Sequence, residues 1–142
     1  MNLFRDCLVF GAFGLALEVC FTWFFSFKNG KALVADHKTA MGYTHPFYAL
    51  TYASVAVTFS LFGTEIFARD FILRFWFYVV YAFVFEIIQN LILGWIFGEP
   101  PSKQVYLKSG KSFRGLVRWD FSLAFGIAGF AFEWLYHSMH QG

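Results

Sequence analysis

The chain has very little charge for its length. Only 14% of its 142 residues are Asp, Glu, Lys or Arg, whereas a soluble globular domain carries about 25%. Nine acidic and eleven basic residues are too few to cover the surface of so small a domain. With 58% hydrophobic residues and a mean hydropathy of +0.55, the sequence predicts an integral, multi-pass membrane protein. The net charge of only +2, with no basic stripe apart from the loops, excludes nucleic acid as a partner.

Cysteine pairs, metal-ligand spacings and nucleotide-binding motifs are also missing. Cys7 and Cys20 lie in one apolar run that we expect to be helical, so roughly 20 Å separates them and they cannot form a disulfide bond. No CxxC or Cys/His spacing indicates a metal, and no Walker loop, dinucleotide-binding glycine pattern or Ser/His/Asp order is present. We therefore predict no metal, no cofactor and no ATP-driven pump.

Four apolar segments are long enough to cross a bilayer, which takes about 20 helical residues. They cover residues 3–27, 45–67, 71–97 and 119–137, and most of the charge lies between them. Four tryptophans lie towards the segment ends, as in an interfacial aromatic belt: Trp23, Trp95, Trp119 and Trp134. The sequence predicts a single all-α membrane domain over residues 1–142, built as a four-helix bundle.

The loop before the last segment has a pattern of its own. Apolar and polar residues alternate on both sides of Ser109-Gly110 in VYLKSGKSFR. Such alternation is typical of a short β-hairpin with its turn at these two residues. A polar loop without strands fits the same sequence equally well.

Basic residues are unevenly distributed between the two sides of the predicted bundle. The first and third loops together carry eight basic residues, and the opposite side carries Arg5, Arg69 and Arg74. The positive-inside rule then places both termini outside the cytoplasm. Several of these bases could instead be functional. The eight basic residues of the first and third loops are Lys28, Lys31, Lys38, Lys103, Lys108, Lys111, Arg114 and Arg118.

Two segments share a pattern of small residues that ends in an acid. Residues 10–18 read FGAFGLALE and residues 125–133 read FGIAGFAFE. In each, two glycines and a glutamate are spaced i, i+3, i+7 and share one helix face. We expect these glycines to allow close helix packing in a bilayer. The recurrence fits inverted internal symmetry, as in secondary transporters, or chance in a Phe-rich chain. The residues are Gly11, Gly14 and Glu18, and Gly126, Gly129 and Glu133.

Three glutamates lie deep in apolar segments: Glu18, Glu86 and Glu133. Three unpaired carboxylates at helix centres would cost on the order of 7–10 kcal/mol. We therefore expect them to face inward as one cluster, protonated, hydrogen-bonded or paired with a base. Such a cluster would form either a polar cavity or ion path, or contacts that hold helices together. Candidate partners are Arg74, Tyr78, Asn90, Arg118 and Asp120.

Glu65 and Arg69 are four residues apart near the end of the second segment. We expect them to form an ion pair at the membrane interface.

The order of these motifs resembles a family of small four-span membrane proteins. Its members are transmembrane protein 229 of animals and bacterial proteins called putative ABC transporter type IV membrane proteins. The similarity covers about residues 8–135, and it implies four spans and the same site residues. The matching phrases are Gly11/Gly14 with Glu18 and Phe21-Thr22, Gly42-x-Thr44 with Tyr52, Arg74-x3-Tyr78-x7-Glu86, and Phe113-x-Gly115-Leu116 with Asp120-Phe121 and Glu133.

The sequence departs from this family in two respects. The family's aromatic-Asp-Tyr-Ser phrase after the third span is replaced here by Glu99-Pro100-Pro101. The basic loop between spans two and three of the animal members implies cytoplasmic termini, which is opposite to the charge count above. Nothing in this chain supports the coupling to ATP that the bacterial name implies.

Three classes of function remain open. The leading one is a small transporter or lipid-handling protein whose glutamates bind a proton, a cation or a cationic headgroup, while Arg74 or Arg118 engages an anionic group. The second is a non-catalytic accessory or assembly subunit whose acids contact a helix of another protein. The third is an intramembrane enzyme with an acidic general acid/base near His137, although no nucleophile is identifiable. The expected partners are the lipid bilayer and either a second copy of the chain or a membrane partner protein.

Overall fold

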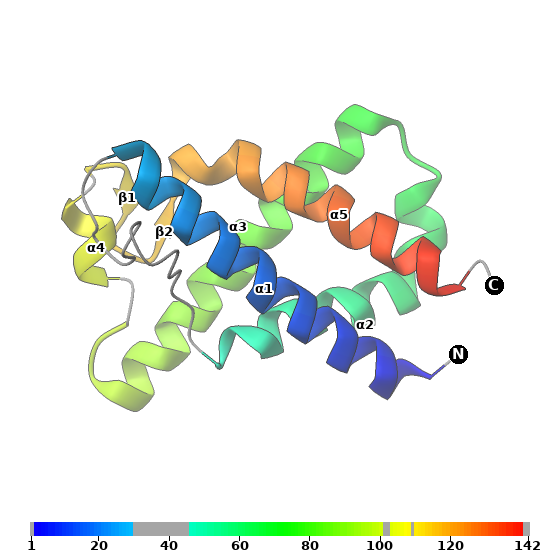
Figure 1. Ribbon diagram of the computed structural model, residues 1–142, viewed down its shortest axis with the longest axis horizontal. Helices are drawn as coiled ribbons and strands as arrows, with labels where there is room; N and C mark the ends of the chain where they lie inside the picture. The colour runs from blue at the N-terminus through cyan, green and yellow to red at the C-terminus, as the bar shows by residue number, and fades with distance from the viewer. Residues whose placement is uncertain (1, 30–45, 101–102, 109, 141–142) are drawn as a thin grey trace.

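The computed structural model describes residues 2–29, 46–100, 103–108 and 110–140, with the side chains of residues 23–29, 104–105 and 108 left aside. Four long helices dominate it, joined by a short helix and a two-stranded hairpin (Figure 1). In chain order the elements are α1 (Leu3–Asn29), α2 (Tyr48–Phe67), α3 (Phe71–Phe97), α4 (Lys103–Lys108), β1 (Ser112–Phe113), β2 (Val117–Arg118), the 3₁₀ helix η1 (Trp119–Phe121) and α5 (Ser122–His140).

The predicted helical character is confirmed, and the four apolar segments correspond to α1, α2, α3 and η1 with α5. Over the described residues, α2 and α3 are the two helices that are long and apolar enough to cross a membrane. Only 22% of the apolar window of α2 and 11% of that of α3 are buried. A core helix of a soluble protein would be mostly buried, so this pattern is not that of a soluble core. The start of the second segment, at His45, lies outside the described residues.

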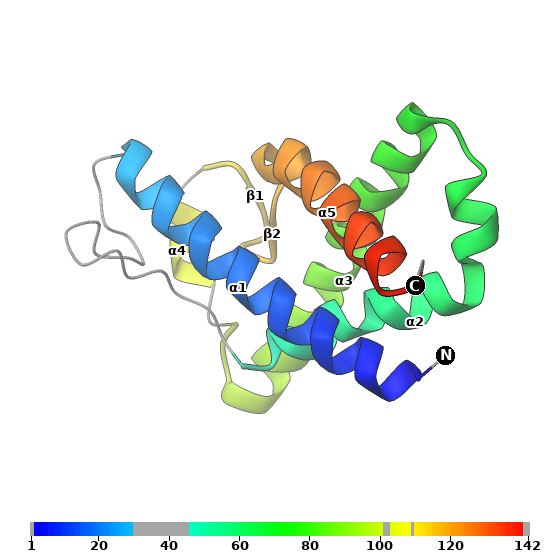
Figure 2. The same ribbon diagram turned by 45° about the vertical axis from the view of Figure 1, so that its right-hand side comes forward.

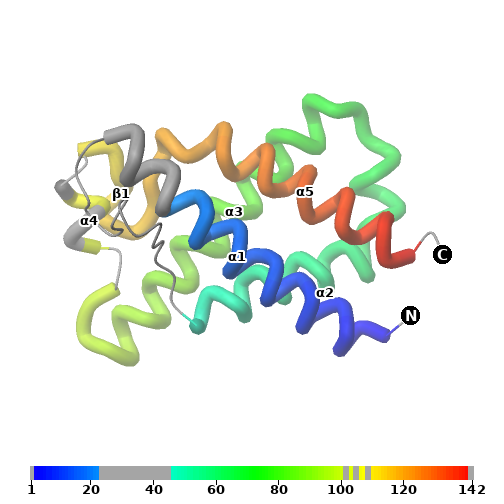
Figure 3. The backbone as a smooth tube through the Cα atoms, viewed as in Figure 1, coloured from blue at the N-terminus to red at the C-terminus, as the bar shows by residue number. Residues whose placement is uncertain are grey.

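The long helices are arranged as two pairs. α1 packs along α2, and α3 packs along α5. The start of α1 and the end of α5 lie together at one end, whereas α4 and the hairpin lie at the other (Figures 1, 2 and 3). Aromatic rings join the two pairs: Phe10 of α1 stacks on Phe132 of α5 at 5.4 Å and meets Phe59 of α2 edge-on at 6.2 Å. All three rings are buried, so they form the centre of the core.

A tight turn joins α2 to α3. The Asp70 side chain accepts a hydrogen bond of 2.9 Å from the backbone N–H of Leu73, and Asp70 itself has extended backbone angles. This is the geometry of an N-cap, so Asp70 fixes the start of α3.

The hairpin before α5 is present, but the predicted position of its turn was wrong. Ser112 pairs with Arg118 and Phe113 with Val117, so the turn comprises residues 114–116 rather than Ser109-Gly110. Gly115 has φ +73°, which favours glycine. A Cβ atom there would lie 3.1 Å from side-chain carbons of Lys103 and Leu107. The turn therefore sits directly on α4, a helix that the sequence did not predict.

Candidate functional site

Both glycine-rich faces pack on a tyrosine of the neighbouring helix. A Cβ atom on Gly14 of α1 would lie 2.0 Å from Cγ of Tyr52 on α2. A Cβ atom on Gly129 of α5 would lie 2.2 Å from Cγ of Tyr78 on α3. Because real Cβ atoms do not approach so closely, only glycine permits this helix spacing. Gly11 contacts Ala49 and Gly126 contacts Phe75, one helical turn away in each pair.

The same tyrosines bind the glutamate one turn beyond the glycine. Tyr52 donates a hydrogen bond of 2.9 Å to Glu18, and Tyr78 donates one to Glu133. The glycine-bearing helix comes first in the pair α1/α2 and last in the pair α3/α5. A tandem duplication of a helical hairpin would keep one order, so the repeated pattern is a shared packing arrangement in two pairs of opposite order.

We call the first polar group the Arg74–Glu133 cluster; it consists of Arg74, Tyr78, Glu133 and His137. Arg74 donates to one carboxylate oxygen of Glu133, and the Tyr78 hydroxyl donates to the other. His137 lies one turn further along α5, and its Nε2 is 4.0 Å from Oε1 of Glu133. Glu133 is buried, and the Arg74 guanidinium carbon lies 5.6 Å from the centre of the Phe130 ring. The acid thus has both a base and a hydroxyl on its two oxygens.

The second group, the Glu18–Glu86 cluster, consists of Glu18, Tyr52, Glu86 and Tyr106. Tyr106 of α4 donates a hydrogen bond of 2.5 Å to Oε1 of Glu86. The carboxyl groups of Glu18 on α1 and Glu86 on α3 interact electrostatically. Within the described part of the chain, the buried Oε2 of Glu86 has no hydrogen-bond partner.

Tyr106 covers this acid pair from the loop region. Burial raises the pKa of Tyr106 well above its ordinary value, and the charge of Glu86 raises it further. The hydroxyl therefore stays protonated and acts as the donor in its bond to Glu86. The electrostatic interactions of Tyr106 also include Glu18, which places all three side chains in one polar region.

Arg118 and Asp120 form an ion pair beside this region. The guanidinium donates to both carboxylate oxygens at 3.0 and 2.7 Å and lies 4.1 Å from the centre of the Phe121 ring. Burial alone would raise the pKa of Asp120, but the hydrogen bond and the charge of Arg118 outweigh it and hold the pKa below its usual value. Arg118 also interacts electrostatically with Glu86, although its hydrogen bonds go to Asp120.

Asn90 has a different position from the one predicted for it. It is fully buried, and its amide donates a hydrogen bond of 2.7 Å to the backbone carbonyl of Leu116. Asn90 therefore fastens the turn of the hairpin to α3, and this holds the loop that carries Arg118 and Asp120.

The structure does not gather the three glutamates into one cluster as expected. Arg74 and Glu86 are separated on α3 by about three turns, or about 18 Å. Glu133 accepts a hydrogen bond from Arg74, whereas Glu18 interacts electrostatically with Glu86. Two separate polar groups result because α5 packs along α3 and brings Glu133 to Arg74, about three turns from Glu86.

Sequence reasoning missed another buried acid, Asp6. Its side chain is only 1% exposed. Nη2 of Arg5 lies 3.1 Å from one carboxylate oxygen of Asp6, and Nε2 of His140 lies 3.1 Å from the other. This contact joins the first turn of α1 to the last turn of α5. The available signal was an acid near the start of an apolar segment, which must find a partner when buried.

The predicted pair between Glu65 and Arg69 was wrong. Within the described residues, neither side chain forms an ion pair or a hydrogen bond. Helix α2 ends at Phe67, so the two residues do not share a helix and lose the spacing on which the prediction depended. The described part of the chain also holds no group of three or more His, Cys, Asp or Glu residues that could bind a metal ion.

Comparison with known proteins found no matching family model, no similar curated protein and no similar solved structure.

Proposed function

We propose that the protein is a multi-pass membrane protein that binds a proton or a small cation at the Glu18–Glu86 cluster and exchanges it across the membrane. In this proposal α1, α2, α3 and α5 all cross the bilayer. The chain would then belong with the small four-span membrane proteins that its motifs resemble.

The observation that carries this proposal is the unpaired oxygen of Glu86. Two acids interact electrostatically in a region where each has a tyrosine as hydrogen-bond donor, and the buried Oε2 of Glu86 has no partner among the described residues. Neighbouring carboxylates in a medium of low polarity do not readily carry two full charges. A proton or a monovalent cation on this pair would supply the missing partner and reduce the repulsion.

Glu133 is less suited to this role. Its two oxygens are already occupied by Arg74 and Tyr78, and the neighbouring guanidinium compensates its charge. A proton arriving there would have to break an existing ion pair. We therefore assign the exchange to Glu18 and Glu86, and a structural role to Glu133.

Infrared difference spectroscopy in liposomes tests the proposal directly. A carboxyl group that holds a proton shows a carbonyl band that shifts in deuterated water and disappears when the group ionises. We expect this band in the wild type and its loss in Glu86→Gln. Glu99→Gln is the matched control, because Glu99 is exposed and pairs with Lys103 at 3.0 Å on the surface.

Proton flux into the same liposomes gives the second measurement. We expect a pH gradient to dissipate faster with wild-type protein than with Glu18→Gln or Glu86→Gln, and as fast with Glu99→Gln as with wild type. Equal flux and an unchanged infrared band in all four proteins would overturn the proposal. Recovery of a stoichiometric protein partner that Glu86→Gln releases would favour the accessory role instead.

A further inference from the structure

A cavity of about 180 Å³ lies where α2 turns into α3. It is lined by Glu65, Ile66, Arg69, Leu73, Arg74 and Phe77. Its volume is comparable with that of an apolar cavity that holds a benzene-sized molecule. Four of the six lining residues are exposed at the surface, so a ligand could enter here without opening the bundle.

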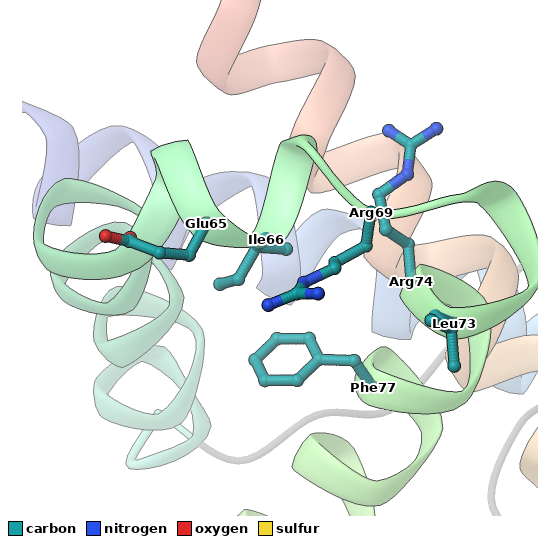
Figure 4. Close-up of a pocket in the computed structure, with 6 residues that line it drawn as sticks. All are labelled: Glu65, Ile66, Arg69, Leu73, Arg74 and Phe77. Carbon is teal, nitrogen blue, oxygen red and sulfur yellow. The ribbon is translucent and has the colours of Figure 1, made fainter.

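Two residues of opposite charge line this cavity, and the Glu65 carboxylate points away from Arg69 (Figure 4). Over the described residues, Glu65 and Arg69 have no ion pair and no hydrogen bond from their side chains. The Arg69 guanidinium points into the space between α2 and α3 above Phe77, whereas that of Arg74 points away from the pocket (Figure 4). Arg74 is paired with Glu133 through Nη1 and its guanidinium points out of the pocket, so Arg69 is the cation that the cavity offers to a ligand.

The position of the cavity indicates what surrounds it. A helix of 20 residues is about 30 Å long, which matches the hydrocarbon thickness of a bilayer. If α2 and α3 cross a membrane, the turn at residues 68–70 lies at the headgroup level of one leaflet. The remaining walls are Ile66, Leu73 and Phe77, which suit the start of an acyl chain.

We infer that this cavity binds a phospholipid whose headgroup carries both a phosphate and a primary ammonium group. Arg69 binds the phosphate, because a guanidinium donates paired hydrogen bonds to phosphate oxygens. Glu65 accepts hydrogen bonds from the ammonium. The inference shares with the proposed function the premise that α2 and α3 cross a membrane, but it concerns a different site.

Native mass spectrometry with defined lipids tests this inference. The purified full chain is mixed in detergent with equal amounts of phosphatidylethanolamine, phosphatidylglycerol and phosphatidylcholine. We expect wild-type protein to retain phosphatidylethanolamine most strongly. Arg69→Gln should weaken this binding about tenfold, the effect of one charge-assisted hydrogen bond. Glu65→Gln should remove the preference over phosphatidylglycerol, because the ammonium loses its acceptor.

Arg114→Gln and Glu99→Gln are matched controls, because they remove exposed charges outside this cavity and should leave the lipid preference unchanged. Equal retention of the three lipids, or equal retention by wild type and both cavity variants, would overturn the inference. Displacement of the lipid by an equal concentration of soluble phosphoethanolamine would overturn the lipid assignment in favour of the free zwitterion.

Two further measurements separate this inference from the proposed function. Carbonate washing of membranes tests the shared premise, because a protein that crosses the bilayer stays in the membrane fraction. Arg69→Gln is expected to keep the infrared band of the protonated carboxyl group. A washed membrane that retains the protein, with that band present but no lipid preference, would overturn the lipid site alone.

Discussion

The Arg74–Glu133 and Glu18–Glu86 clusters are built on the same scaffold but differ in the charge of the second residue. An arginine joins the glutamate in the first cluster, and another glutamate does so in the second. In both, a glycine lets a tyrosine approach the neighbouring helix, and that tyrosine binds the glutamate one turn further on. In the first, an arginine completes the carboxylate's contacts. In the second, Glu18 interacts electrostatically with another glutamate, Glu86, whose Oε2 has no hydrogen-bond partner among the described residues.

One packing arrangement can therefore serve two purposes. An acid paired with a base in a region of low polarity is neutral as a unit, so it can hold helices together without exchanging anything. Under the proposed function, two interacting acids take up a mobile positive charge to reduce their repulsion. The scaffold fixes where a glutamate lies, and in this proposal the second side chain near it determines whether it is structural or binds an ion.

Removing the base of the first cluster should lower the free energy of unfolding more than any other change predicted below. Arg74→Met leaves the buried carboxylate of Glu133 without its counter-charge, and the side chains of this pair are only 22% and 10% exposed. We expect the free energy of unfolding to fall by about 3–5 kcal/mol. Denaturation in mixed micelles, followed by helical circular dichroism, measures this loss.

The double variant Arg74→Met/Glu133→Leu is the control for this experiment. It replaces the whole pair by apolar side chains, so most of the lost stability should return. A loss below about 1 kcal/mol for Arg74→Met would show that the pair behaves like an exposed surface ion pair, and the contrast between the two clusters would fail.

The shared scaffold is tested by the two glycines. Gly14→Ala and Gly129→Ala each force a Cβ atom into the ring of a tyrosine, at 2.0 and 2.2 Å from its Cγ. Overpacking of this kind typically costs about 1–3 kcal/mol, and we expect similar values at both positions. Gly11→Ala is the matched control, because its nearest contact would be 3.3 Å, to the Ala49 carbonyl oxygen. Equal stability of all three variants in the same unfolding assay would contradict the proposed spacing.

The two tyrosine hydroxyls separate a structural role from an ion-binding one. Tyr78→Phe and Tyr106→Phe each remove one hydrogen bond to a glutamate, at a cost of about 1 kcal/mol in the free energy of unfolding. Only Tyr106→Phe should also shift the infrared band of the protonated carboxyl group, because Glu86 belongs to the acid pair. An equal spectral shift in Tyr78→Phe would remove the distinction between the clusters.

Much of the fold was predictable because long apolar helices carry strong sequence signals. The bounds of α3 were predicted as residues 71–97 and are the same in the structure, since Asp70 caps its start and Gly98 follows its end. The hairpin turn was misplaced because alternation along VYLKSGKSFR looked like strand structure. Residues 103–108 form α4 instead, and the turn of the hairpin rests on this helix.

The candidate site was predictable in its residue types but not in its grouping. Apolar surroundings single out Glu18, Glu86 and Glu133, since each must find a partner. Which partner each one finds depends on the heights at which helices cross, and these are set by contacts distant in sequence. Tyr106 illustrates the limit, because it reaches Glu86 from a helix that the sequence pattern did not reveal.

Asp120→Asn tests why Arg118 does not pair with Glu86 as Arg74 pairs with Glu133, and we expect its effect on stability to be small. Because Arg118 holds the pKa of Asp120 below its usual value, this ion pair stabilises the fold fully above about pH 4, and the contribution is lost as the pH falls through the folded-state pKa. Asp120→Asn should therefore lower the unfolding temperature slightly at neutral pH, by an effect of about 1 kcal/mol or less. Its difference from wild type should vanish in acid. The same variant releases Arg118 towards Glu86, with which it already interacts electrostatically, so the band of the protonated carboxyl group should weaken at neutral pH. An unchanged band would mean that the pair with Asp120 is not what keeps Arg118 from binding Glu86.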